Sequence, residues 1–321
     1  MIEVKNLSKK YGTHLAVEDV SFTVNDGEVL GLLGLNGAGK STIMNIMTGY
    51  ISMTTGSVSI NGYDILEKPL NAKKHIGYLP EIVPLYPDMT VKEYLYFLYD
   101  LKKVKLPRAP HIDEICRLVK LENVFSRLIK NLSKGYRQRV GIASALIGNP
   151  DVIILDEPTV GLDPRQIIEI RSLIHNLGKN HTVIVSSHIL SEIQSVCDRV
   201  IVINNGRLIA DGKPKELSHM LSNDVLKLRV KGTGSAIKTD VIKTLTAGDG
   251  IGIREIIPTG STEENCEDFS ILPIDGTDIR EEIIKRLVGA GVPILSLSTA
   301  ELDLEQIFLS LTDKNGKESE E

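Results

Sequence analysis

The sequence lacks the long apolar runs and the leader segment that would place a chain in or across a membrane. A membrane-spanning helix needs about 20 consecutive apolar residues, and no run in these 321 residues approaches that length. The first twelve residues, MIEVKNLSKKYG, also lack the apolar stretch of a secretory signal. These absences predict a cytoplasmic protein.

Cysteine and histidine are too scattered for a disulfide framework or a metal cluster. The three cysteines, Cys116, Cys197 and Cys266, lie far apart, and the seven histidines show no H-x-x-x-H type of spacing. We expect small buried or half-buried thiols in a reducing compartment. A net charge of -5 argues against a broad nucleic-acid-binding surface, and only a local basic patch is left open.

The most informative stretch is VLGLLGLNGAGKSTIMNIMT, from Val29 to Thr48. An apolar run that predicts a buried strand leads into a glycine-rich loop, and a helical apolar pattern follows. Glycines at 34, 37 and 39 let successive backbone N–H groups form a nest for anionic oxygens. Lys40 can reach phosphates and Ser41 can bind Mg²⁺. The alternative is an ordinary glycine-rich turn; because all the spaced residues are present, we favour a nucleoside triphosphate site.

Two further predicted strands end in polar residues that suit the same site. Asp156 and Glu157 follow the apolar run Val152–Leu155, as expected of a strand that leaves a sheet beside a metal. His188 stands at the carboxyl end of Thr182–Ser187, where ligands gather in open α/β sheets. A lone histidine there is more often structural, but its position relative to the phosphate loop favours a role. Tyr11 could stack on a purine base, and plain surface structure is its competing interpretation.

The pattern of elements predicts an α/β domain over 1–221 with a helical insert at about 84–150. Antiparallel strands are predicted at 2–5 and 15–24, a hairpin at 57–65 and a short strand at 75–79. The insert contains helices at 91–101, 112–121 and 134–147, with Ser133 as the N-cap of the last and a breaker at 106–110. A helix starts at 161–164, a hairpin at 200–210 closes the domain, and a short helix covers 214–221.

The remaining residues predict a separate α+β unit over 222–312. Strands at 225–230, 251–257, 269–274 and 294–297 alternate with helices at 236–245 and 279–290. That order, βαββαβ, is the ferredoxin-like arrangement. A closing helix is predicted at 302–311, and residues 313–321 form a polar tail.

Five motifs occur in the order found in ATP-binding cassette (ABC) ATPases, and the first 215 or so residues resemble that family closely. The motifs are Gly34–Thr42, Leu132–Gly135, Leu155–Pro158, Gly161–Pro164 and Ser187-His188. The resemblance implies a P-loop NTPase fold of the ABC type, with an antiparallel β-subdomain. It also implies two such domains, head to tail, with two ATP molecules between them.

The resemblance further implies roles for individual residues. Glu157 would be the general base, His188 the γ-phosphate sensor, and Lys40 a phosphate ligand. Mg²⁺ would be held by Ser41 and, through its water shell, Asp156. The other residues expected to contact ATP are Tyr11, Gly34, Asn36, Gly37, Ala38, Gly39 and Thr42, with Ser133, Gly135 and Asp163 acting on the partner's ATP.

Two positions depart from the commonest family pattern. The signature is Leu132-Ser133-Lys134-Gly135-Tyr136 rather than LSGGQ, and Glu81 stands where most members carry glutamine. We expect Glu81 to contact Mg²⁺ or the attacking water. Both variants resemble the ABC-2 type ATPases, which serve exporters, and the segment Ala300–Phe308 resembles the end of their accessory domain.

The resemblance therefore implies an ATPase subunit, most simply a homodimer, that drives export through separate transmembrane permease subunits. It would lie on the cytoplasmic face of the membrane, with the permease docking near 84–101 on Leu85, Tyr94, Leu95, Tyr96 and Tyr99. By themselves these tyrosines favour core and rim packing.

Three other functions would leave different features in the sequence. An importer ATPase of the sugar type would append an all-strand domain, and a soluble ABC ATPase acting on ribosomes or DNA would carry a second cassette or a long coiled-coil insert. A degenerate binding module would lack the intact Lys40, Asp156, Glu157 and His188. The sequence does not name the cargo, because the membrane subunits select it.

Overall fold

The computed structural model describes residues 1–214, 217, 226–232, 235–246, 252–261, 263, 265–274 and 278–299. The chain divides into two compact units, Met1–Pro214 and Lys215–Glu321. The short helix predicted at 214–221 lies largely outside the described residues, and the closing helix at 302–311 and the tail at 313–321 lie wholly outside them. Among the helices that are described, none is long and apolar enough to cross a membrane.

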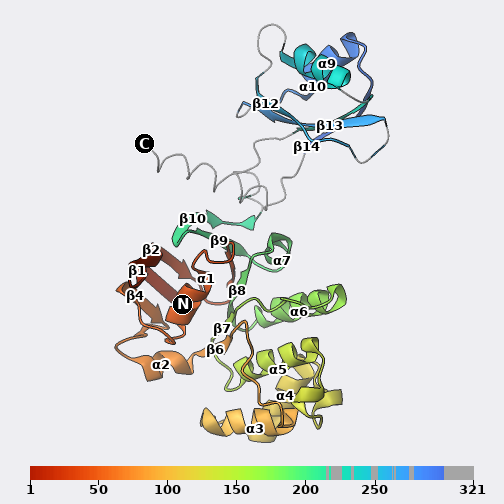
Figure 1. The fold of residues 1–321 in the computed structure, drawn as a ribbon. Coiled ribbons are helices and arrows are strands. Elements are labelled where there is room, and N and C mark those ends of the chain that lie inside the picture. Colours follow the sequence, from red (N-terminus) through yellow and green to blue (C-terminus); the bar gives the residue numbers. More distant parts are fainter. Residues whose placement is uncertain are drawn as a thin grey trace. The chain divides into compact units, whose positions relative to one another are not determined.

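The first unit combines an antiparallel sheet, a mostly parallel sheet and a group of helices (Figure 1). Its elements in chain order are β1 (Ile2–Tyr11), β2 (His14–Val24), β3 (Val29–Leu33), α1 (Lys40–Met47), β4 (Thr55–Ile60), β5 (Tyr63–Asp64), α2 (Pro69–Lys74), β6 (Ile76–Leu79), α3 (Val91–Leu101), α4 (Arg108–Leu118), two 3₁₀ turns (Glu122–Val124 and Ile129–Asn131), α5 (Lys134–Leu146), β7 (Val152–Leu155), α6 (Pro164–Leu177), β8 (Thr182–Ser187), α7 (Leu190–Gln194), β9 (Arg199–Asn204) and β10 (Arg207–Gly212).

The larger sheet brings the carboxyl ends of four distant segments to one edge. Its strand order is β10-β9-β3-β8-β7-β6, with every pair parallel except β9 and β10. All residues of β3 and β7 are buried, as expected for strands covered on both faces. Because β8 lies between β3 and β7, His188 emerges between the glycine-rich loop and Asp156. The sequence indicates that His188 suits the same site, but it does not give the strand order that places His188 there.

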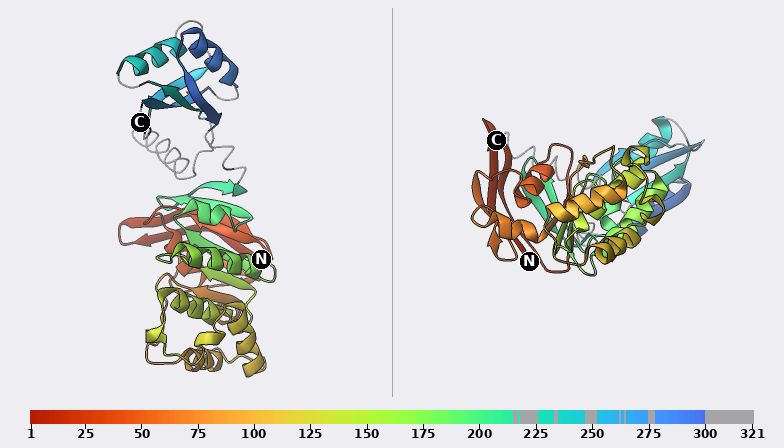
Figure 2. Two further views of the ribbon diagram at one scale, coloured as in Figure 1. Left: turned by 90° about the vertical axis from the view of Figure 1, so that its right-hand side faces the viewer. Right: turned by 90° about the horizontal axis from the view of Figure 1, so that it is seen from below.

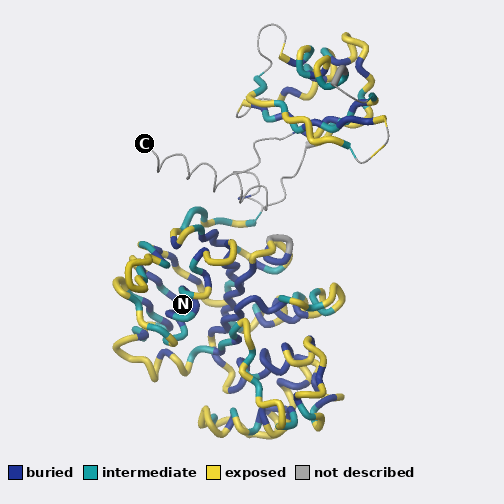
Figure 3. Tube along the Cα trace, in the orientation of Figure 1, coloured by how far each residue is buried: buried dark blue, intermediate teal, exposed yellow. Residues whose placement is uncertain are grey.

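Helix α1 is sandwiched between the two sheets, and α6 and α7 cover the opposite face of the larger one (Figures 1 and 2). The apolar side of α1 joins residues of β1, β2 and β4 and residues of β3, β7, β8 and β9 in one core. On the far face α7 approaches β3 so closely that a Cβ at Gly31 would lie 2.4 Å from Ile193 Cγ2. Figure 3 shows this sheet as the most deeply buried part of the unit. The glycine-rich loop is therefore held on a rigid base.

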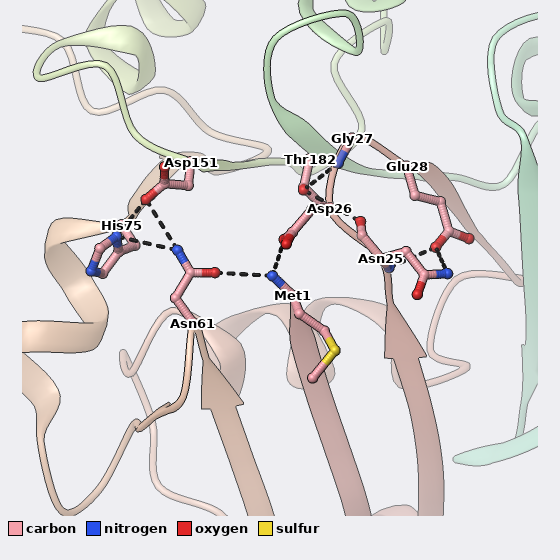
Figure 4. Close-up of polar contacts among 9 residues, drawn as sticks. All are labelled: Met1, Asn25, Asp26, Gly27, Glu28, Asn61, His75, Asp151 and Thr182. Carbon is pink, nitrogen blue, oxygen red and sulfur yellow. Dashed lines mark hydrogen bonds and ion pairs between the residues drawn. The ribbon is translucent and has the colours of Figure 1, made fainter.

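Polar contacts tie the turns of the antiparallel sheet to the larger sheet (Figure 4). Asn61, in the turn between β4 and β5, donates from Nδ2 to Asp151 Oδ2 at 3.1 Å, and Asp151 also pairs with His75. Farther along, the Gly27 N–H donates to Thr182 Oγ1 on β8 at 3.0 Å. Hydrogen bonds as well as the shared apolar core therefore join the two sheets.

Two predictions for the helical insert differ from the structure. The helix predicted at 112–121 begins instead at Arg108, because Pro110 occupies the first turn, where no backbone N–H has an intrahelical partner. The predicted docking side chains Tyr94, Leu95 and Tyr99 are buried, and Tyr94 Oη donates to Pro84 O at 3.1 Å. These three residues pack the insert and cannot receive a partner helix. Helix α2, a short segment, was not predicted.

The second unit has the predicted βαββαβ order. Its elements are β11 (Leu226–Lys231), α9 (Ser235–Thr246), β12 (Ile253–Pro258), β13 (Cys266–Pro273), α10 (Arg280–Gly289) and β14 (Ile294–Thr299). The strand order is β12-β13-β11-β14, with every pair antiparallel. Apolar residues of both helices pack with the sheet into a single core. This arrangement is ferredoxin-like, as predicted.

Candidate active site

The loop between β3 and α1 needs glycine for conformation and for space. Gly37 and Gly39 have φ values of 85° and 107°, which a residue with a Cβ rarely adopts. A Cβ at Gly34 would lie 2.4 Å from Ile203 O on β9. With these three positions fixed, the loop turns directly into α1, whose first backbone N–H groups are free to bind an anion.

Lys40 is buried at the first turn of α1. Its Nζ donates to Gly34 O at 2.7 Å and to Leu35 O at 3.3 Å. Nζ also lies 3.5 Å from Glu157 Oε1. The ammonium group is therefore held inside the loop, facing the carboxylate that follows β7.

One hydroxyl group organises the two carboxylates after β7. Ser186 Oγ on β8 donates to Asp156 Oδ1 at 2.6 Å and accepts the Glu157 N–H at 2.9 Å. Glu157 has a left-handed backbone, with φ of 48°. Strained backbone of this kind persists where neighbouring contacts hold it. Ser186 thus fixes the direction in which Glu157 points.

The Glu157 carboxylate lies between a cation and an imidazole. Its Oε2 is 3.0 Å from His188 Nδ1. Its Oε1 is buried and accepts no hydrogen bond from any described residue, although Lys40 is nearby. A buried carboxylate oxygen normally has a hydrogen-bond donor. Oε1 is therefore available to accept a proton or a hydrogen bond from a bound molecule.

Tyr78 and Glu81 lie beside this group without joining it. Burial and the nearby charge of Asp156, with a smaller contribution from Glu81, raise the pKa of the Tyr78 hydroxyl well above its usual value. Tyr78 Oη donates to Asn45 Oδ1 on α1 at 3.2 Å, which links β6 to the phosphate-loop helix. Glu81 follows Pro80 at the end of β6 and is exposed.

The signature residues form a second group, separate from Lys40, Glu157 and His188. Ser133 caps α5 by accepting the Tyr136 N–H, and Asp163 caps α6 by accepting the Gln166 N–H at 3.0 Å. Gly135 is buried so close to Gln166 that a Cβ would lie 2.6 Å from it. No hydrogen bond or ion pair between described residues joins the two groups.

The other predicted contact residues surround the loop. Tyr11 ends β1 with 47% of its surface exposed, and Lys9 Nζ lies 5.1 Å from its ring centroid. Asn36 and Ser41 are exposed, Thr42 is partly buried, and Ala38 is buried. A base and a phosphate chain could therefore reach Tyr11 and Ser41 from solvent.

Four polar residues that no sequence motif indicated hold the site residues in place. They are Ser186, Thr159, Glu192 and Arg171. One signal was available: Ser186 and Ser187 end a strand directly after the apolar residues 183–185, and buried hydroxyl groups need partners. The identity of those partners is a tertiary fact.

Comparisons with known proteins find a matching family model, related proteins and similar structures. The family model described as ABC transporter matches residues 17–160. The chain is 31% identical to the linearmycin resistance ATP-binding protein LnrL of Bacillus subtilis (strain 168), over 98% of this chain and 99% of LnrL. It is 33% identical to the Nod factor export ATP-binding protein I of Burkholderia orbicola (strain AU 1054), over 98% and 97%. A dimeric post-hydrolysis ATP-binding cassette bound to ADP and Pi matches at 26% identity, over 67% of this chain and 99% of that one.

 The TM-score of 0.61 for this cassette extends the likeness from sequence to fold.

Proposed function

Because the chain belongs to the ABC transporter ATP-binding proteins and is an ATPase subunit of such a transporter, we propose that Lys40, Glu157 and His188 are its hydrolytic group. We further propose that hydrolysis drives export through separate membrane subunits, as the names of the Nod factor and linearmycin relatives suggest. An importer role, or a role outside transport, would be the competing outcome.

The observation that carries the proposal is the position of the Glu157 carboxylate. Oε1 is buried without a hydrogen-bond donor, Oε2 contacts His188, and Lys40 lies 3.5 Å from Oε1. A carboxylate held in this way can accept a proton from an attacking water, while His188 keeps its orientation. Lys40, already on the phosphate loop, supplies positive charge toward the phosphates.

The residues present also fit Mg²⁺. Mg²⁺ takes oxygen ligands and commonly uses only one or two protein groups, together with waters and substrate phosphates. Ser41 offers an exposed hydroxyl group, and Asp156 offers a carboxylate that Ser186 orients. Bound Mg²⁺ would neutralise phosphate charge as it develops. Glu81 is exposed at the same sheet edge and would approach only once the metal screens its charge from the phosphates.

The second group would act on the ATP of a partner cassette. Ser133 and Asp163 are exposed at the N-termini of α5 and α6, where backbone N–H groups and the helix dipole favour anions. ABC cassettes dimerise, as the related dimeric structure shows. We propose that this chain forms a homodimer in which Ser133, Gly135 and Asp163 complete the partner's site.

The membrane subunit would dock on the insert through side chains other than the buried Tyr94, Leu95 and Tyr99. Tyr86 and Phe97 are exposed and contact each other edge to face, with ring centroids 5.7 Å apart. Ile82 is 85% exposed. Exposed apolar side chains of this size suit an interface with a partner of apolar character. The protein would then lie on the cytoplasmic face of the membrane.

The test is Glu157→Gln in the purified protein. We expect hydrolysis to fall by about 10²–10⁴-fold, because the amide keeps the shape of the side chain without its basicity. ATP binding should persist, and a nucleotide-bound dimer should accumulate. Glu67→Gln, at an exposed glutamate, serves as the control. Turnover near that of the wild type in Glu157→Gln would refute the assignment, and a pull-down from membranes would identify the permease.

A further inference from the structure

We propose that Glu192 is a positioning residue that holds the segments after β7 and β8 in one geometry, so that Glu157 and His188 stay together. Glu192 lies in the first turn of α7 and is buried. It contacts neither the phosphate loop nor Lys40 in any hydrogen bond or ion pair among the described residues. The inference rests on the proposed roles of Glu157 and His188.

A single carboxylate oxygen of Glu192 joins the two segments. Thr159 Oγ1 donates to Glu192 Oε2 at 2.5 Å, and Ser187 Oγ donates to the same oxygen at 3.2 Å. Thr159 is two residues after Glu157, and Ser187 directly precedes His188. Ser187 Oγ also accepts the Ile189 N–H at 3.0 Å, so the backbone on both sides of His188 is fixed.

The second oxygen extends the connection to α6. Glu192 Oε1 lies 3.9 Å from Arg171 Nη2, and α6 is the helix that Asp163 caps. A buried carboxylate is stable only when cations and donors surround it, so these partners are coupled to one another. Three segments of the proposed site therefore share one anchor.

The arrangement explains how the catalytic distance is maintained. Ser186 orients Asp156 and the Glu157 backbone directly, but His188 has no comparable bond from Ser186. Glu192 supplies that constraint through Ser187. Misplacement of a reacting group by about 1 Å can cost about 10²-fold in rate, so loss of this anchor should reduce turnover more than ATP binding.

The test compares Thr159→Val, which removes the hydroxyl group at nearly constant volume, with Thr159→Ser, which keeps it. We expect Thr159→Val to lower kcat by about tenfold or more with little change in ATP affinity, and Thr159→Ser to restore kcat. Ser187→Ala is the second variant and should act in the same direction. Ser172→Ala is the matched control, because among the described residues Ser172 Oγ donates within α6, to Ile168 O.

A double-mutant cycle separates positioning from general structural damage. In the His188→Ala background, Thr159→Val should change kcat by less than about twofold, because the distance it maintains no longer matters. An equal loss in both backgrounds, unchanged kcat in Thr159→Val, or unfolding of that variant in a thermal melt would each overturn the proposal. Glu157→Gln is measured in the same assay. If it is inactive while Thr159→Val is fully active, only this inference fails; if it is active, the proposed function fails.

Discussion

Lys40 has three defined partners in the candidate site. Its ammonium group is buried, bonded to two backbone carbonyl oxygens of its own loop and paired with Glu157. A phosphate chain entering the loop would compete for the same ammonium protons. The lysine therefore organises the loop as well as supplying charge.

We predict that Lys40→Ala weakens ATP binding by roughly 10–100-fold, because a charge-assisted hydrogen bond is worth about 1.5–3 kcal/mol. Calorimetric titration with ATP measures the loss. Lys73→Ala is the matched control, since Lys73 Nζ also donates to a backbone carbonyl, that of Gly49, at 2.9 Å. Equal affinity in Lys40→Ala and Lys73→Ala would show that Lys40 does not face the phosphates.

At the scale of single elements, Ser133 has two proposed roles at the N-terminus of α5. Ser133 caps the helix, and the family resemblance gives it the partner's γ-phosphate as well. Aspartate caps helices about as well as serine does, but it carries a negative charge. The cap and the anion site can therefore be tested apart.

We predict that Ser133→Asp keeps the stability of the wild type to within about 0.5 kcal/mol but abolishes the ATP-dependent dimer, whereas Ser133→Ala costs about 1 kcal/mol. Urea unfolding measures the first effect. Size-exclusion chromatography with ATP, in the Glu157→Gln background, measures the second. A Ser133→Asp protein that still dimerises would remove Ser133 from the interface.

The packing of α7 against β3 protects a thiol. Burial, with the charge of Asp198 adding to it, raises the pKa of Cys197 to about 12, and burial raises that of Cys116 to about 11. In the unfolded chain both thiols ionise near pH 8.5. The folded state therefore keeps its protons above pH 8.5, and stability falls as the pH rises from there toward 11.

We predict that iodoacetamide at pH 8.5 labels Cys116 and Cys197 about a hundredfold more slowly in the native protein than in urea. Peptide mass spectrometry assigns each labelled site. The free energy of unfolding, measured by urea titration, should be lower at pH 10 than at pH 8. Rapid native labelling of Cys197 would show that α7 does not stay packed on β3.

Elements could be predicted from the sequence where the residues that determine them are neighbours in the chain. The helix at Val91–Leu101 was predicted with its observed bounds from apolar spacing, which is a local signal, and the structure adds a capping box of Thr90 and Glu93 at its start. The first part of β13 was missed, since Glu267 and Asp268 make it look polar. Both acids have partners from distant segments, Lys238 and Arg229, and sequence spacing alone does not reveal such pairs.

The same distinction applies to the candidate site. The phosphate loop and the carboxylates after β7 could be predicted because each motif is contiguous. The structure places both Lys40 and His188 in contact with Glu157. The support from Ser186, Thr159 and Glu192 could not be predicted, because it depends on β8 lying beside β7 and on the turn of α7.

At the scale of the whole molecule, the residues proposed to handle phosphate all belong to the first unit. The two compact units divide at Pro214, and the second unit has its own apolar core. We therefore propose that the cassette is self-sufficient for nucleotide binding, with the second unit serving regulation or dimer contact.

We predict that a fragment of residues 1–221 folds cooperatively and binds ATP with the affinity of the full chain. Circular dichroism on heating and calorimetric titration check the two claims. Expression of the fragment as an aggregate, or as a monomer that does not bind ATP, would place the boundary elsewhere.

The neighbours of β3 have a consequence for how the protein is made. β3 ends at Leu33, but the strands that flank it, β8 and β9, begin at Thr182 and Arg199. A ribosome adds about 5–20 residues per second, so β3 waits roughly 8–30 s for its first neighbour. Such distant pairing slows folding and leaves apolar strands uncovered meanwhile. The nucleotide pocket is thus among the last features of its unit to form during translation, and nascent chains that stop before β8 should depend on chaperones.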